Sequence, residues 1–127
     1  MNASRPDTIL VIDPDPAFRV LILALLRREG YLAEGTDDPN DALRLHQSAP
    51  YTAVVMDPRI RAGDKLLCAL HAPEDAETPR RNVIVVTAPD GAKERYAGHP
   101  RVHAVLFKPF FLSELAAAVA ACCGRAN

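Results

Sequence analysis

The stretch Ala53-Val54-Val55-Met56-Asp57 carries the pattern that decides the fold: an apolar run that stops at one polar residue. Three other apolar runs stop in the same way, at Asp13, Thr87 and Lys108. Short apolar runs bounded by turn residues are typical of buried strands. The carboxyl ends of parallel strands share one edge of an open α/β sheet, and ligands bind there. The pattern therefore predicts that two carboxylates, a hydroxyl and an ammonium converge at one edge.

Helical patterns alternate with the apolar runs, which predicts five strands and five helices in alternation. Two helices begin with an aspartate N-cap and a proline, at Asp15-Pro16 and Asp38-Pro39, and end near Gly30 and Pro50. The other helices are expected at about 64–70, from a cap at Asp90 to Tyr96, and at 112–123. Strands are expected at 9–12, 31–35, 51–56, 83–86 and 103–107. Right-handed crossovers then give a flavodoxin-like, doubly wound five-stranded parallel sheet of order 2-1-3-4-5, with helices on both faces.

The composition is that of an ordinary globular domain, with 127 residues of which 49% are hydrophobic and 24% charged. We expect a single domain over 1–127 with a structured core at about 8–123. A net charge of -1 gives no reason to expect direct binding to nucleic acid or an anionic membrane. The longest apolar stretch, 112–123, is shorter than the ~20 residues of a membrane span, and no signal peptide is recognisable, so a cytoplasmic location is expected.

Cysteine and histidine spacing does not predict a metal site. The three cysteines are interpreted as small hydrophobic residues in a reducing compartment: Cys68, Cys122 and Cys123. The four histidines are interpreted as solvated surface residues: His46, His71, His99 and His103.

The four polar strand ends suggest phosphoryl chemistry. Two ionised carboxylates held close together repel each other unless a proton or a cation lies between them. Mg²⁺ accepts one or two carboxylates, so Asp13, Asp57 and a backbone carbonyl of the following loop, that of Arg59, are candidate ligands. A carboxylate can also attack phosphorus and form an aspartyl phosphate. The Lys108 ammonium and the Thr87 hydroxyl are suited to contact the oxygens of the transferred group.

Four motifs in order resemble the receiver domain of bacterial two-component response regulators: ILVIDPDPAFR at 9–19, AVVMD at 53–57, VIVVTA at 83–88 and LFKPF at 106–110. The resemblance covers nearly the entire chain. It implies that Asp57 is the phosphoacceptor, Thr87 the switch hydroxyl and Lys108 the lysine that pairs with the phosphate. It further implies Mg²⁺ as cofactor, a histidine kinase or phosphotransfer protein as donor, and a downstream protein target. Apart from its own phosphotransfer, such a domain is not an enzyme.

The chain departs from the family pattern at the acidic pair. Receivers usually place two adjacent acids after the first strand, whereas this sequence has Asp13-Pro14, and a proline side chain offers no ligand atom. We expect Mg²⁺ affinity to fall by at least roughly 10 to 100-fold, the effect of losing even a supporting partner of a ligand. Asp15 is a substitute ligand in principle, but capping the first helix is the favoured interpretation.

Other departures lie beside the acceptor and on the output side. Arg59, Arg61 and Lys65 add positive charge after Asp57, and solvation is the favoured interpretation of these side chains. Val105 stands where many receivers carry a Tyr or Phe that turns inward on activation, so aromatic rotation cannot report the phosphate at that position. The nearby aromatic residues are interpreted as core or edge packing rather than a switch: Phe107, Phe110 and Phe111.

Two alternatives to a phosphoacceptor stay open. The first is a degenerate receiver that binds partners without phosphorylation, which Pro14 and Val105 favour. The second is a phosphohydrolase, because Asp13-Pro14-Asp15 also resembles the D-x-D motif of haloacid dehalogenases. A later acidic pair and a cap domain are missing, so this alternative is disfavoured. The chain is expected to be a stand-alone regulator or a fragment, and a homodimer through the surface from the fourth strand to the last helix is left open.

Overall fold

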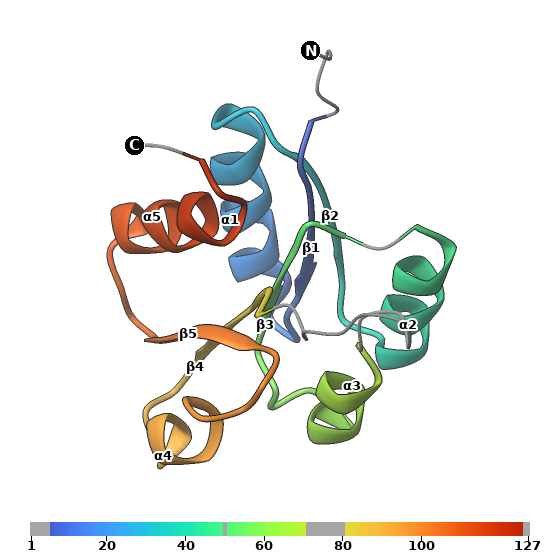
Figure 1. Ribbon diagram of the computed structural model, residues 1–127, viewed down its shortest axis with the longest axis vertical. Helices are drawn as coiled ribbons and strands as arrows, with labels where there is room; N and C mark the ends of the chain where they lie inside the picture. The colour runs from blue at the N-terminus through green and yellow to red at the C-terminus, as the bar shows by residue number, and fades with distance from the viewer. Residues whose placement is uncertain (1–5, 50, 71–80, 126–127) are drawn as a thin grey trace.

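The computed structural model describes residues 6–49, 51–70 and 81–125, which contain one five-stranded parallel sheet of order β2-β1-β3-β4-β5 (Figure 1). The strands are β1 (Thr8–Ile12), β2 (Leu32–Thr36), β3 (Ala53–Met56), β4 (Val83–Thr87) and β5 (Val102–Phe107). The helices are α1 (Pro16–Arg28), α2 (Pro39–Ser48), α3 (Gly63–Ala69), α4 (Ala92–Tyr96) and α5 (Leu112–Cys122). The predicted alternation and strand order are confirmed. Within the described residues, no helix is long and apolar enough to cross a membrane.

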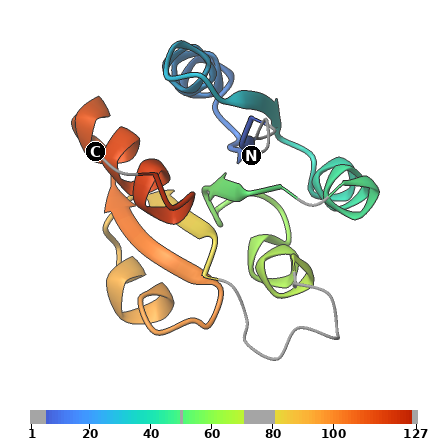
Figure 2. The same cartoon turned by 45° about the horizontal axis from the view of Figure 1, so that its top comes forward.

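Two hydrophobic layers sandwich the sheet, because alternate residues of each strand point to opposite faces. In β1, Ile9 and Val11 join α1 and α5 in one core, while Leu10 and Ile12 join α2, α3 and α4 in the other. Figure 2 shows the helices on both sides of the sheet. The strands in the middle of the sheet are therefore buried on both faces, which is why they are continuous apolar runs in the sequence.

The predicted aspartate N-caps of the first two helices, α1 and α2, are confirmed. The Asp15 carboxylate accepts hydrogen bonds from the backbone of Ala17 and Phe18 at the start of α1, and Asp38 accepts one at the start of α2. At α4 the predicted cap is wrong. Gly91, with φ 70°, is the N-cap residue there, and the Asp90 carboxylate instead lies 3.0 Å from the Arg59 guanidinium. The partner of the Asp90 carboxylate is therefore the Arg59 guanidinium and not, as predicted, the backbone at the start of α4.

The interpretation of all histidines as surface residues is wrong for His46, which is 7% exposed. His46 follows the buried Ala42 by four residues on α2, so both side chains face the sheet, and its ring stacks on Tyr51 at 6.4 Å. His71 lies outside the described residues. Among the cysteines, Cys122 and Cys123 pack partly against the α1 and α5 core, whereas Cys68 is exposed and is no core residue.

Candidate functional site

The four polar strand ends lie together at the carboxyl edge of the sheet. Asp13 follows β1, Asp57 follows β3, Thr87 ends β4 and Lys108 follows β5. The Lys108 ammonium donates to Asp13 Oδ2 at 2.8 Å and to Asp57 Oδ2 at 3.0 Å. The Thr87 hydroxyl donates to Asp57 Oδ1 at 2.9 Å. The strand order brings these four residues together, because β1 and β3 are neighbours and β4 and β5 lie next in the sheet beyond β3.

Burial makes the electrostatics of this cluster strong. Asp13, Asp57 and Thr87 are 2%, 4% and 2% exposed. Burial raises the pKa of the Asp13 carboxyl, although the hydrogen bond and the charge of Lys108 oppose the shift. Burial alone would lower the pKa of Lys108, but its hydrogen bonds to both carboxylates outweigh burial and raise this pKa. Two buried carboxylates therefore share one ammonium.

The backbone after each aspartate fixes the orientation of its carboxylate. The Asp15 amide donates to Asp13 Oδ1 at 2.9 Å, and the Arg59 amide donates to Asp57 Oδ1 at 3.0 Å. The Arg19 guanidinium donates to the backbone carbonyl of Asp13 at 2.6 Å. Each of these contacts joins residues that are two to six positions apart in sequence, so the turns after β1 and β3 themselves orient the two carboxylates.

Lys108 is further oriented by aromatic rings that the sequence did not identify as part of the site. Its nitrogen lies 4.2 Å from the centre of the Phe18 ring, a cation-π distance, and the Phe18 ring stacks on Phe110 at 5.8 Å. In the sequence Phe18 has the periodicity of a core position on the first helix, so no signal marked it. Phe110 packs as predicted, whereas Phe111 is 77% exposed and the packing interpretation is wrong for it.

The residues beside Asp13 fit a magnesium ion only in part. Asp13 and Asp57 converge and supply the carboxylates that Mg²⁺ prefers. The Asp15 carboxylate does not join them, because it caps α1, so its use as a substitute ligand is not supported. No cluster of three acidic, histidine or cysteine side chains suited to a metal occurs in the part of the chain that the structure describes. The side chains that would hold Mg²⁺ here are therefore two carboxylates, both of which are bonded to Lys108.

A second set of polar contacts ties the loop after Asp57 and α3 to α4. Arg59 pairs with Asp90 in the loop between β4 and α4. Asp64, in the first turn of α3, accepts a hydrogen bond from the Tyr96 hydroxyl at 2.7 Å and pairs with Arg95. Burial and the hydrogen bond to Asp64 raise the pKa of Tyr96 to about 12. These partners are about thirty residues apart in sequence, and their identity and charge alone did not reveal them.

Arg61 and Lys65, predicted to be solvated, are exposed, and the structure shows both at the edge of a groove between α2 and α3. Arg59 is also largely exposed, although it is ion-paired. Val105 is half-buried and packs beside the core on the α4 side of the sheet.

Comparison with known proteins places this arrangement in a family. The family model for the response regulator receiver domain matches residues 9–120. The response regulator MprA of Mycolicibacterium vanbaalenii is 36% identical over 114 residues, which are 88% of this chain and 48% of that protein. The chain thus spans about half the length of this curated relative.

Solved structures agree with the family match. A response regulator receiver protein from Burkholderia phymatum has a TM-score of 0.75 and 26% identity, covering 96% of this chain and 98% of that one. The receiver domain of the sensor histidine kinase PA1611 from Pseudomonas aeruginosa, with a magnesium ion in its active-site cleft, has a TM-score of 0.73 and 27% identity. That match covers 94% of this chain and 99% of the other. The chain therefore belongs to the response regulator receiver domain family, the signalling domains of two-component systems.

Proposed function

We propose that the chain is a receiver domain that accepts a phosphoryl group on Asp57 from a histidine kinase or phosphotransfer protein. The observation that carries the proposal is the contact set of Asp57: a buried carboxylate whose oxygens are held by Thr87, Lys108 and the Arg59 amide. A carboxylate fixed in this way is oriented for attack on phosphorus. The hydroxyl and the ammonium are already beside the position that the phosphoryl oxygens would take.

In the proposed reaction, an Asp57 oxygen forms a bond to phosphorus while the bond from phosphorus to the donor nitrogen breaks. The donor imidazole keeps the electron pair of that bond, and the product is an aspartyl phosphate. Lys108 moves its hydrogen bond from Asp57 to a phosphoryl oxygen, and the Thr87 hydroxyl donates to another. Mg²⁺, held by Asp13, Asp57 and the backbone carbonyl of Arg59, would neutralise charge on the transferred group when bound.

The output of the proposed switch is a changed protein-binding surface. When the Thr87 hydroxyl leaves Asp57 for the phosphate, the loop that follows β4 moves with it. That loop contains Asp90, which is paired with Arg59, and it leads into α4, where Tyr96 is bonded to Asp64. The proposal therefore routes the signal through the polar contacts of α3 and α4, because Val105 has no aromatic ring to rotate. The downstream target is a protein, and a homodimer through the surface from β4 to α5 is compatible with the same route.

A degenerate receiver that binds its partners without phosphorylation is the second candidate. Two observations favour it: the proline side chain at position 14 has no ligand atom where receivers usually have an acid, and Lys108 forms ion pairs with both Asp13 and Asp57. In that case the cluster would serve mainly to hold the carboxyl edge of the sheet together, and partner binding would be constitutive.

Intact-mass spectrometry after incubation with acetyl phosphate and Mg²⁺ separates the two candidates. Phosphorylation predicts a gain of one phosphoryl group, which Asp57→Asn abolishes and Glu29→Gln, at an exposed carboxylate after the last turn of α1, leaves in place. The range of Mg²⁺ concentration should extend well above that used for an ordinary receiver, because Pro14 weakens the site. Absence of any mass gain in the folded protein at saturating Mg²⁺, also with a phosphorylated phosphotransfer protein as donor, would exclude the phosphoacceptor and leave the degenerate receiver.

A further inference from the structure

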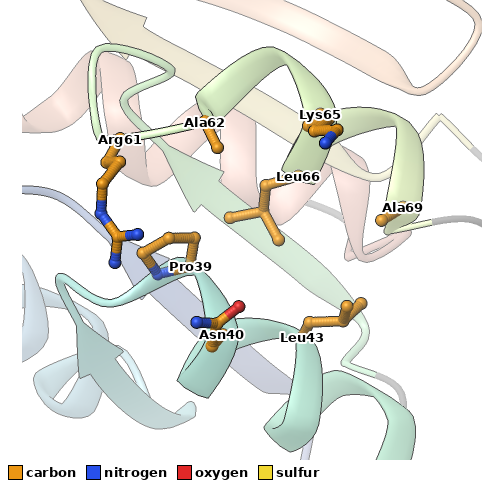
Figure 3. Close-up of a pocket in the computed structure, with 8 residues that line it drawn as sticks. All are labelled: Pro39, Asn40, Leu43, Arg61, Ala62, Lys65, Leu66 and Ala69. Atoms are coloured by element: carbon orange, nitrogen blue, oxygen red, sulfur yellow. The ribbon is translucent and has the colours of Figure 1, made fainter.

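The structure contains a groove between α2 and α3, away from the carboxylate cluster. Its volume is about 280 Å³, and it is lined by residues of both helices and of the loop before α3: Pro39, Asn40, Leu43, Arg61, Ala62, Lys65, Leu66 and Ala69. Figure 3 shows Leu66 from α3 pointing toward α2, and the Arg61 side chain extending beside Pro39. Leu43, Leu66 and Ala69 thus supply apolar groups to the groove. Lys65 lines it from α3, and the Arg61 guanidinium lies beside Pro39 at the start of α2.

The charged side chains that line this groove, Arg61 and Lys65, are both positive. Within the described part of the chain, neither Arg61 nor Lys65 has an ion pair or a side-chain hydrogen bond, and both are exposed. The nearby Arg44 and Arg59 do have acidic partners, Asp41 and Asp90. An exposed cation without a partner is ordinary on its own. Two of them beside an apolar groove complement a ligand that has both apolar and acidic groups.

The size and shape of the groove favour a peptide over a small molecule. Ligand pockets for drug-sized molecules usually span about 300 to 1,000 Å³, and this volume lies just below that range. The groove is open and lies between two helices, a setting in which amphipathic helices insert apolar side chains at i, i+3, i+4 and i+7. Leu43 and Leu66 would contact those side chains, while acidic residues at the edge of the peptide would meet Arg61 and Lys65.

We propose that the α2 and α3 groove binds an acidic, amphipathic helical segment of a partner protein, with Leu43 and Leu66 as its apolar contacts and Arg61 and Lys65 as its charge contacts. The inference does not depend on phosphorylation, since the residues that line the groove are distinct from those that hold the Asp57 carboxylate. Its failure would leave the proposed phosphotransfer intact, and the reverse also holds.

An unbiased phage-displayed peptide library provides the test. The library is selected on the unphosphorylated chain alone, without depletion on any variant. The selected peptides are expected to be enriched in Asp and Glu, with large apolar residues at helical spacing. A synthetic peptide of roughly 15 residues, long enough to form a helix, is then measured by fluorescence anisotropy. Amide shifts in NMR spectra of the chain locate the binding surface on α2 and α3.

Matched variants give the expected size of the effect. Reversing both charges in Arg61→Glu/Lys65→Glu should weaken binding roughly tenfold or more, and added salt should weaken binding to the wild type. Leu43→Ala should also weaken it, through loss of apolar contact. Arg28→Glu/Lys93→Glu makes the same charge change on α1 and α4 and should leave affinity within about twofold. If the charge-reversed variant does not fold, as judged by circular dichroism, Arg61→Ala/Lys65→Ala replaces it.

Three outcomes would overturn the inference. They are selection of peptides without acidic enrichment, amide shifts that map outside α2 and α3, and equal affinity for the wild type and the charge-reversed variant. Light scattering of the chain alone tests whether a second copy of the chain occupies the groove. A dimer that dissociates in Arg61→Glu/Lys65→Glu would assign the groove to self-association and would also overturn binding to a partner protein.

Discussion

The Lys108 ammonium lies 2.8 Å from the Asp13 carboxylate, although 95 positions separate the two residues in the sequence. The contact joins the ends of β1 and β5, which are not neighbours in the sheet. The same ammonium also bonds Asp57 at the end of β3, so one side chain connects three strands at the carboxyl edge. The cluster therefore has a structural role as well as the proposed chemical one.

Replacing Lys108 by Met should destabilise the fold and make it responsive to Mg²⁺. Without the ammonium, two buried carboxylates face each other. A broken buried pair costs about 3–5 kcal/mol, and partial exposure of Lys108 reduces the expected loss to roughly 1–3 kcal/mol. Urea denaturation measures the loss, and added Mg²⁺ should recover more stability in Lys108→Met than in the wild type. Lys93→Met, at an exposed lysine of α4, should change little. Equal stability of Lys108→Met and the wild type would contradict the structural role.

Substitutions of Asp15 distinguish between its roles as a helix N-cap and as a metal ligand. Asp15→Ala should lower the free energy of unfolding by about 1 kcal/mol, because the amides of Ala17 and Phe18 lose their acceptor. Asp15→Asn should keep most of the stability, since asparagine is also a good N-cap residue. Neither variant should change the Mg²⁺ affinity measured by titration calorimetry. A parallel loss of affinity in both variants would instead identify Asp15 as a ligand.

Restoring the missing acid should strengthen the metal site. Pro14→Asp places a carboxylate next to Asp13, and we expect the Mg²⁺ dissociation constant to fall by about tenfold or more. Pro14→Ala is the matched control, because it removes the proline ring without adding a ligand and should leave the affinity unchanged. Calorimetric titration of both variants with MgCl₂ measures the difference. Tighter binding in Pro14→Ala as well would mean that the ring blocks the metal rather than that a ligand is missing.

Much of the fold was predictable because the signals for it are local. Apolar runs mark the strands, and Asp15 and Asp38 followed by proline mark the first two helices. The meeting of Asp13, Asp57, Thr87 and Lys108 followed from topology, since parallel strands end at one edge. Their proposed roles in phosphotransfer still rest on the family resemblance and on the contacts described above.

The remaining contacts were not predictable because they depend on pairings between distant surfaces. Asp90 has the sequence context of a helix cap, yet a cation thirty-one positions away is its partner. His46 is a polar residue on a short helix, and only the direction of α2 relative to the sheet determines that it is buried. The groove depends on the relative placement of two helices, α2 and α3, which is set by packing and not by either segment alone.

Gly63 should be essential for the loop that follows the acceptor. A Cβ built at Gly63 would lie 1.8 Å from the Pro58 carbonyl oxygen, so the backbone of the loop would have to shift. Gly63→Ala should lower the free energy of unfolding by roughly 1–3 kcal/mol, the usual cost of such crowding, and slow the phosphorylation of Asp57. Gly98→Ala is the control, because nothing lies within 4 Å of its Cβ position. Urea denaturation and intact-mass kinetics measure both effects, and similar behaviour of the two variants would contradict the close contact.

The Tyr96 hydroxyl should make stability fall at alkaline pH. Its pKa is raised from 10.0 to about 12 in the folded chain, so the fold favours the neutral phenol. This contribution is fully present below the unfolded value of 10.0 and is lost as the pH rises through about 12. It amounts to at most about 2–3 kcal/mol. Tyr96→Phe should therefore lose roughly 1 kcal/mol at neutral pH, with the hydrogen bond to Asp64, but should show a flatter decline above pH 10.

Tyr51 has the same alkaline shift, to about 12, through burial and its hydrogen bond to Glu34. Tyr51→Phe should therefore remove a similar part of the decline. The double variant should remove both parts, because the two tyrosines lie in separate contacts and their effects should add. Urea denaturation at a series of pH values from neutrality to about 12 tests this. A decline in Tyr96→Phe as steep as in the wild type would mean that the phenol is not held neutral, and the bond between α3 and α4 would then contribute little to the fold.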